Sequence, residues 1–176
     1  MPHLKSLPEN ATMLDVYKLD MELAQPIVRY QQQLLRGPSP LTPEQREMIG
    51  AYVSSLNACQ FCFGVHTAVA ERFGVAPETI ERLTGEGPAA AVDAKFAALL
   101  DYVGKLTREP AKITAKDAEA VYAAGWDDTA LFHAVLVAGF FNFFNRLADG
   151  LGLEIDDETR ARAAQGLHEV GYEGRM

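Results

Sequence analysis

The stretch that says most about the fold is residues 42–74, which read TPEQREMIGAYVSSLNACQFCFGVHTAVAERFG. It opens with a helix start, because Thr42 is a good cap, a proline occupies the first helical position and Gln45 lies three residues after the cap. Asn57 is then a suitable N-cap for a second helix, which ends near Gly74. The stretch predicts two consecutive helices joined by a short turn.

The rest of the chain has the same pattern of caps, helical apolar periodicity and breaks at glycine and proline. No segment alternates apolar and polar residues as a half-buried strand does. We therefore expect an all-α fold in a single domain, residues 1–176. The further helices are expected over residues 27–35 with Pro26 at the first position, 77–83, 91–106, a segment from Thr114 with Asp117 in the capping box, a long helix opened by Asp127 and Asp128 that runs through Gly150, and 156–167.

The composition excludes several classes of partner. The 176 residues carry a formal net charge of −8, and 48% of them are hydrophobic. Nucleic acids and anionic membranes would repel such a chain, so neither is an expected partner. The first twenty residues contain no apolar run of signal-peptide length, and the longest apolar stretch, 134–144, is too short to span a bilayer. We expect a cytoplasmic protein that does not bind a membrane.

The two cysteines of the chain lie three residues apart as Cys59-Gln60-Phe61-Cys62, and His66 follows four residues after the second. In a reducing cytoplasm such a pair is more often catalytic or metal-binding than structural. It can pass between a dithiol and a disulfide, and its reactivity depends on how readily one thiol ionises. On a helix Cys62 and His66 are neighbours on one face. Redox chemistry at sulfur is the leading interpretation.

The residues alone leave open which cysteine attacks a substrate. Proximity to His66 favours Cys62, whereas a position at the helix terminus and expected exposure to solvent favour Cys59. Glu47 lies on the preceding helix, twelve residues before Cys59. If the two helices fold back on each other, Glu47 can hydrogen-bond to His66 and orient it, which would complete an acid–base–nucleophile arrangement.

A family resemblance rests on this spacing. The pattern Glu47-x11-Cys59-x2-Cys62-x3-His66 resembles the active-site signature of the AhpD-like alkylhydroperoxidases, within the carboxymuconolactone decarboxylase superfamily. The resemblance covers residues 20–155 and implies an AhpD-like helical bundle, a homo-oligomer and reduction of hydroperoxides by a thiol pair. Two further segments look like those of the peroxidase-related branch: Pro38-Ser39-Pro40-Leu41-Thr42 and Asn142-x2-Asn145-Arg146-Leu147-Ala148-Asp149.

Carried over by position, the resemblance assigns roles to these residues. Cys62 is the implied thiolate that attacks the hydroperoxide, and Cys59 condenses with the resulting sulfenic acid to form a disulfide. His66 is the implied base, held by Glu47. No cofactor or metal is implied; the implied partners are a small-molecule hydroperoxide and an external dithiol or protein reductant. Well-studied members have a histidine before the second cysteine, where this chain has Phe61, so we expect weaker activity or another substrate.

Other interpretations use the same residues. A thiol–disulfide oxidoreductase that does not act on peroxide would use the same cysteines, whereas non-redox decarboxylases of the superfamily generally lack the pair. A structural zinc site would use Cys59, Cys62 and His66, with Glu47 or His133 as the fourth ligand. The cysteines would otherwise be two small buried apolar residues.

The segment 140–149 carries aromatic and polar residues together. The phenylalanines surround the expected helix on nearly every side, which predicts burial in the core or, by preference, between subunits. The polar residues share one face, where a polar contact between helices is the leading interpretation and Arg146 can pair with Asp149 or Asn142. The residues concerned are Phe140, Phe141, Phe143, Phe144, Asn142, Asn145, Arg146 and Asp149.

Overall fold

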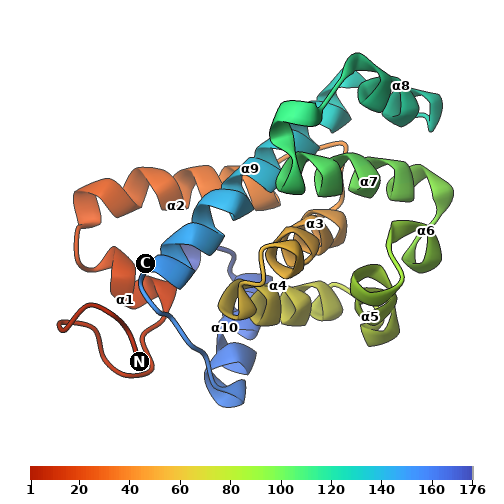
Figure 1. Ribbon diagram of the computed structural model, residues 1–176. Coiled ribbons are helices and arrows are strands. Elements are labelled where there is room, and N and C mark those ends of the chain that lie inside the picture. The colour runs from red at the N-terminus through yellow and green to blue at the C-terminus, as the bar shows by residue number, and fades with distance from the viewer. Residues whose placement is uncertain (176) are drawn as a thin grey trace.

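The computed structural model describes residues 1–175, which form an all-helical fold with no β-strand in that range, as predicted. The long helices are linked by short connections, and two short 3₁₀ turns lie near Pro110 and at the end of the described chain (Figure 1). The elements are α1 (Met13–Tyr17), α2 (Met21–Arg36), α3 (Pro43–Leu56), α4 (Gln60–Arg72), α5 (Pro77–Gly85), α6 (Pro88–Ala91), α7 (Ala94–Arg108), η1 (Pro110–Lys112), α8 (Ala115–Ala123), α9 (Asp128–Gly150), α10 (Asp157–Glu169) and η2 (Glu173–Arg175).

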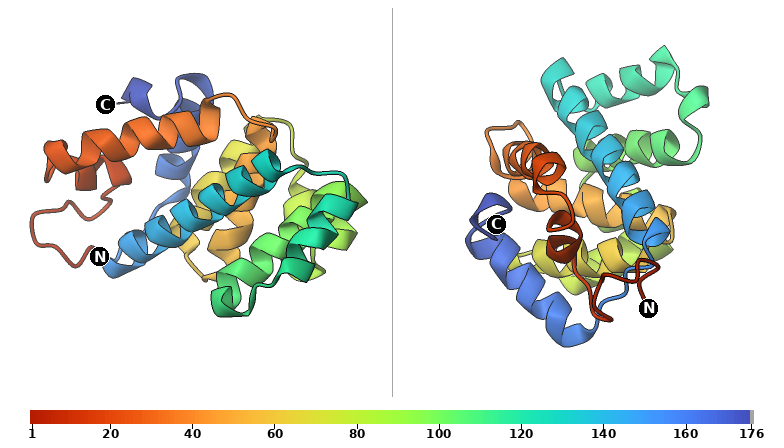
Figure 2. Two further views of the ribbon diagram at one scale, coloured as in Figure 1. Left: turned by 90° about the horizontal axis from the view of Figure 1, so that it is seen from above. Right: turned by 90° about the vertical axis from the view of Figure 1, so that its left-hand side faces the viewer.

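The centre of the fold is the helix pair α3 and α4. Helix α9 packs across α3, and α7 packs against both α3 and α9. Helix α10 covers α4, while α2 runs beside α9 (Figures 1 and 2). The N-terminal segment, residues 1–20, reaches the far end of α9, where the His3 backbone N–H donates to the Leu151 carbonyl at 2.8 Å (Figure 2). Segments from both ends of the chain therefore lie over the central pair.

Local capping fixes several helix boundaries where the sequence predicts them. Thr42 and Gln45 form a capping box at the start of α3, and Thr114 forms one with Asp117 at the start of α8. The side chain of Asp127 accepts a hydrogen bond from the backbone N–H of Ala130, which caps α9. Each such cap satisfies backbone donors that have no partner within the helix.

Two predicted boundaries away from the cysteine helix were wrong. Helix α2 begins at Met21, capped by Asp20, and Pro26 lies inside it rather than at its first position. Pro26 is the sixth residue of the helix, so it removes one backbone hydrogen bond beyond the first turn, at a cost that the rest of the helix has to offset. Residues 91–106 do not form one helix: Pro88–Ala91 is a separate turn, and Asp93 caps α7 from Ala94. In both cases an aspartate cap outweighs the apolar periodicity that set the expectation.

The core is densest where α9 meets α3. Gly50 lies under the ring of Phe141, and a Cβ at that position would overlap the ring. Of the phenylalanines of α9, Phe141 and Phe144 lie in the core, whereas Phe143 is 49% exposed in the single chain, so its burial between subunits stays a prediction. Helix α9 is long and apolar enough to cross a membrane by length and composition alone. It packs against α2, α3, α4, α7 and α8, as core helices of globular proteins do.

Candidate active site

The turn between α3 and α4 brings the cysteines into position. Ala58 has φ of 58°, a conformation that costs an L-residue about 1–2 kcal/mol, and it turns the chain directly into Cys59. Cys59 is the N-cap of α4, and Cys62 is the third residue of the helix. The prediction that Asn57 caps this helix was wrong: Asn57 ends α3, and its side-chain amide donates to Asn142 at 3.1 Å and Asn145 at 2.8 Å.

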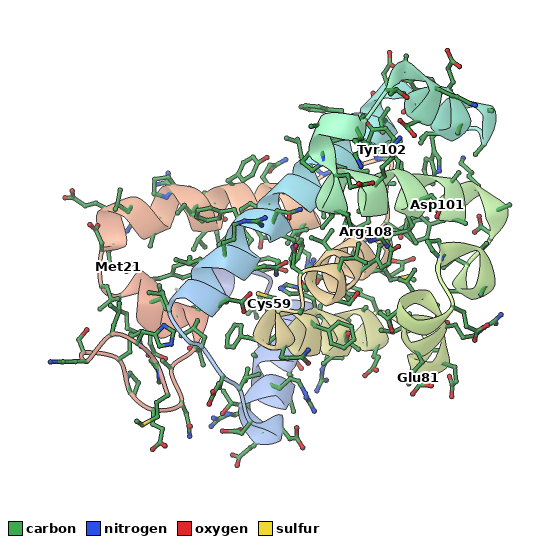
Figure 3. The ribbon with its side chains drawn as sticks, in the orientation of Figure 1. Met21, Cys59, Glu81, Asp101, Tyr102 and Arg108 are labelled. Atoms are coloured by element: carbon green, nitrogen blue, oxygen red, sulfur yellow. The ribbon has the colours of Figure 1, made fainter. Side chains whose placement is uncertain are left out.

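Both sulfurs lie inside the protein. Cys59 is 0% exposed and Cys62 3% exposed, so the expectation that Cys59 is the exposed thiol was wrong. Figure 3 shows Cys59 at the start of α4, in the middle of the molecule. The cysteines pack with Phe61, Ala148 and Leu153, and the N-terminal segment covers them with Leu7, Ala11, Met13 and Val16.

The environment distinguishes the two thiols. A hydrogen bond from Cys59 and a second from Asn145 hold the pKa of Cys62 below its usual value, against the opposing effects of burial and of the Asp149 charge. The same contact with Cys62, together with burial and a hydrogen bond to Asp149, raises the pKa of Cys59 well above its usual range. These contacts favour ionisation of Cys62 over that of Cys59.

Glu47 and His66 are in hydrogen-bonding contact, as the sequence predicted. Nδ1 of His66 lies 2.6 Å from Oε2 of the fully buried Glu47. The ring of His66 also makes an edge-on contact with Phe141, with centroids 4.5 Å apart. Because Nδ1 is engaged by Glu47, Nε2 is the nitrogen left to exchange a proton.

Two residues that sequence reasoning missed hold Glu47 from the other side. Arg36 forms a 2.6 Å ion pair with Oε1 of Glu47, and the hydroxyl of Tyr172 donates to the same oxygen at 3.0 Å. Burial alone would raise the pKa of Glu47, but the charges of and hydrogen bonds with His66 and Arg36 outweigh it and lower that pKa. Glu47 therefore stays ionised and keeps His66 oriented.

The guanidinium of Arg36 is itself held by two aromatic rings. Its central carbon lies 4.9 Å from the ring centroid of Phe73 and 5.0 Å from that of Tyr172. Burial would lower the pKa of Arg36, but Glu47 raises it, so the arginine remains charged. A cation between aromatic faces gains further stabilisation. In the sequence, Arg36 is a basic residue in the last turn of a helix, which is a common position for arginine. Nothing in the sequence therefore marked it as part of the site.

A cavity of about 70 Å³ connects the two functional groups, because both Cys62 and His66 line it. Most of its wall is apolar, and Thr12, Tyr17, Gln31 and Tyr172 add polar groups to it. The apolar lining consists chiefly of Leu14, Phe61, Val65, Phe141, Phe144 and Leu167. A small, largely apolar cavity suits a small organic molecule with one polar end.

A larger groove of about 550 Å³ lies on the other side of Phe61. Phe61 and Ile155 line both the cavity and the groove, and the groove also carries charged residues such as Arg160 and Glu71. Phe61 therefore stands between the solvent side of α4 and the cavity that holds Cys62.

The residues of the zinc alternative do not form a ligand cluster. His133 lies on α9, where its Nδ1 is 2.8 Å from the hydroxyl of Ser39. Within residues 1–175, no group of three or more histidine, cysteine, aspartate or glutamate side chains is placed to hold a metal ion.

The polar face of α9 contacts the α3–α4 turn, as the interpretation of a polar helix contact predicts. Asn145 is buried, and its amide nitrogen donates to the hydroxyl of Ser54 at 2.9 Å. Of the two partners expected for Arg146, the structure pairs it with Asn142, to whose carbonyl it donates at 2.7 Å. Asp149 instead lies beside Cys59.

Comparison with known proteins agrees with this fold. The profile of the carboxymuconolactone decarboxylase family matches residues 22–103. An uncharacterized peroxidase-related protein from Silicibacter sp. TM1040 is 30% identical, with a TM-score of 0.79, over 84% of this chain and 78% of that one. A comparison with curated proteins finds no match.

Two more distant structures share the fold. One is an uncharacterized peroxidase-related protein from Ralstonia eutropha JMP134, described as an alkylhydroperoxidase AhpD core, 22% identical, with a TM-score of 0.78 over 86% of this chain and 80% of that one. The other is a protein of unknown function from Agrobacterium tumefaciens, 19% identical, with a TM-score of 0.70 over 83% of this chain and 99% of that one. The chain belongs to the AhpD-like group of the carboxymuconolactone decarboxylase superfamily, in its peroxidase-related branch.

Proposed function

We propose that this protein is a thiol peroxidase that reduces small organic hydroperoxides by cycling Cys62 and Cys59 between dithiol and disulfide. The observation that carries the proposal is that Cys62, the thiol with the lowered pKa, lines one cavity with His66, whose other nitrogen is fixed by Glu47. An ionised sulfur beside a histidine is the arrangement that nucleophilic thiol chemistry requires.

The cycle has three steps. The Cys62 thiolate attacks the terminal oxygen of the hydroperoxide: an S–O bond forms, the O–O bond breaks, and the leaving alkoxide takes a proton from His66 to become an alcohol. Cys59 then attacks the Cys62 sulfenic acid, a disulfide forms and water leaves. An external dithiol, small or protein-borne, returns the pair to the reduced state.

The shape of the site supports an organic rather than a highly polar substrate. The cavity wall beside Cys62 is mostly apolar, so an alkyl group gains by entering it. Phe61 occupies the position at which better-studied members of the family carry a second histidine. The proposed proton route to the leaving alkoxide therefore runs through His66 alone, and Phe61 adds apolar surface instead.

We also propose that the protein works as a homo-oligomer in the cytoplasm. Large apolar side chains on the outside of α2 and α9 support self-association, because a second copy would cover them. They include Leu23, Tyr30, Phe132 and Phe143. Cytoplasmic dithiol reductants would supply the electrons for each turnover.

A thiol count after peroxide addition tests the proposal. One molar equivalent of cumene hydroperoxide is added to the reduced protein, and the products are measured by intact mass. We expect both thiols to be lost as one intramolecular disulfide, with cumyl alcohol formed in equal amount. Cys62→Ser should stop consumption of the hydroperoxide, whereas Cys59→Ser should still consume one equivalent and stop at the sulfenic acid. Unchanged consumption by Cys62→Ser would rule out the assignment.

A further inference from the structure

The last two turns of α9 pack on the residues that lead into the cysteine helix. Asn142 and Asn145 accept hydrogen bonds from Asn57, two residues before Cys59. Ala148 packs against Cys59 in the same buried cluster. Asp149 lies one turn after Asn145 and therefore on the same side of α9. The helix thus brings a carboxylate to the start of α4.

Asp149 contacts the thiol that has to lose a proton during disulfide formation. Its carboxylate lies beside Cys59, next to Ala148, which packs against that thiol; Cys59 is fully buried, while Asp149 itself is exposed. Within the described chain, no salt bridge involves Asp149. A carboxylate in the last turn of a helix is unfavourable for the helix itself. Helix stability and ion pairing therefore do not account for an aspartate at this position.

We propose that Asp149 accepts the proton of Cys59 when Cys59 attacks the Cys62 sulfenic acid. The proposal rests on the peroxidase function proposed above. The Cys59 S–H bond breaks and the proton passes to the Asp149 carboxylate, while the Cys59 sulfur forms the S–S bond. The S–O bond of Cys62 breaks, the leaving hydroxide takes up a proton from solvent to become water, and Asp149 returns its proton to solvent. The net change is one thiol and one sulfenic acid converted to one disulfide and one water.

The proposal explains how a buried thiol with a high pKa can react. The contacts that keep Cys59 protonated in the resting enzyme would also make it a poor nucleophile after Cys62 has been oxidised. A carboxylate in contact with the thiol on one side and with solvent on the other gives the proton a way out of the core. It also supplies a proton acceptor in a chain that carries Phe61 rather than a histidine.

Other charged groups at this end of the molecule are already engaged. Arg146 donates to Asn142, His3 lies against the Gly150 carbonyl with Nδ1 at 3.1 Å, and the N-terminal amine pairs with Glu154. On the side of α4, Cys62 is the titratable group that faces Cys59.

The test separates the two chemical steps in Asp149→Asn. Reduced protein is mixed with cumene hydroperoxide in a quenched-flow instrument, and intact mass reports thiol, dimedone-trapped sulfenic acid and disulfide against time. We expect sulfenic acid to form at the wild-type rate or faster, because a negative charge that opposes the Cys62 thiolate has been removed. Disulfide formation should slow by about 100-fold, and its rate should increase with pH as hydroxide takes over the removal of the proton.

Two further variants complete the test. Glu119→Gln removes one exposed negative charge on α8, away from the cysteines, and should behave as the wild type in both steps. Asp149→Glu should recover part of the rate of disulfide formation. A general loss of structure in Asp149→Asn would slow both steps, whereas the proposal predicts opposite directions.

The outcomes are distinguishable. If the wild type forms disulfide and Asp149→Asn does so at the same rate, Asp149 is not the proton acceptor while the peroxidase function stands. Slowing of both steps in Asp149→Asn also contradicts the assignment. If the wild type forms neither sulfenic acid nor disulfide, the peroxidase function itself fails.

Discussion

The hydroxyl of Tyr172 donates a hydrogen bond of 3.0 Å to Oε1 of Glu47, although the two residues lie 125 positions apart in the sequence. Arg36 pairs with the same oxygen, and His66 takes the other. The carboxylate that orients His66 is therefore held by three separate parts of the chain. Its orientation depends on correct packing of the C-terminal residues against α2 and α3.

Removal of the Tyr172 hydroxyl tests this dependence. Tyr172→Phe deletes one hydrogen bond to a buried charged acceptor, and we expect the free energy of unfolding to fall by about 1.5–3 kcal/mol. Denaturant unfolding of the purified protein measures the change. Tyr30→Phe, at a more exposed tyrosine on α2, is the matched control and should unfold as the wild type does. A Tyr172→Phe protein as stable as the wild type would mean that the hydrogen bond contributes nothing.

Glu47 makes the stability of the protein sensitive to acid. Its pKa is lowered in the folded state, so its ionised form stabilises the fold at neutral pH, and this contribution is lost as the pH falls through the folded-state pKa. Glu47→Gln leaves Arg36 buried without its ion pair and should cost about 3–5 kcal/mol at pH 7.

Unfolding free energies measured from pH 7 down to acid check this prediction. The free energy of unfolding should fall less steeply with decreasing pH in Glu47→Gln than in the wild type, because the titrating carboxyl group is gone. Glu44→Gln, in the first turn of the same helix, should keep the wild-type pH dependence. Parallel curves for Glu47→Gln and wild type would contradict the assignment.

Asn145 should set the reactivity of Cys62. Its amide hydrogen bond is one of the two contacts that lower the pKa of that thiol. In Asn145→Ala the pKa should rise, so the midpoint of the pH–alkylation curve should move to higher pH and alkylation at neutral pH should slow. Asn142→Ala loses a contact with the same Asn57 but none with Cys62, and its curve should stay in place.

Phe61→His tests the departure of this chain from better-studied relatives. A histidine beside Cys62 adds a second group that can carry protons, and we expect hydroperoxide consumption to increase by about tenfold or more. Phe63→His is the control, because Phe63 lines the groove of about 550 Å³ but not the cavity that Cys62 and His66 line. Equal rates for Phe61→His and the wild type would mean that His66 alone suffices for proton transfer.

Deletion of residues 1–11 should expose the cysteines. Leu7 and Ala11 belong to the cover over both sulfurs, so the shortened chain should react with a maleimide at least about tenfold faster than the wild type. Lys5→Ala, an exposed change in the same segment, should leave the rate unchanged. Equal alkylation of the shortened and full-length proteins would show that another route already reaches the thiols.

Most of the fold could be predicted because its signals are local. The caps at Thr42, Thr114 and Asp127 involve residues three positions apart, and the structure contains all three. The pairing of Glu47 with His66 followed from the short turn between two helices. Helix α1 was not predicted, although Thr12 and Asp15 form a capping box at its start, because five residues are too few to show a helical apolar period.

Long-range partners could not be predicted in the same way. Arg36 and Tyr172 look like ordinary residues near helix ends, and their contacts with Glu47 exist only after α2 and the C-terminal turn have packed. We expected Cys59 to be exposed because it lies at the start of a helix, a position that is often at the surface. The N-terminal segment covers that helix start, and its contacts join residues far apart in the sequence.

Because the N-terminal segment covers the cysteines, peroxide reduction and regeneration of the dithiol differ in the access to sulfur that they need. A hydroperoxide of a few atoms needs only a narrow path to Cys62, whereas a reductant protein must bring its own sulfur within bonding distance of the disulfide. Local unfolding of residues 1–17 would allow that approach. Turnover would then be limited by how often this segment opens, and conditions that loosen it would speed regeneration while leaving peroxide reduction unaffected.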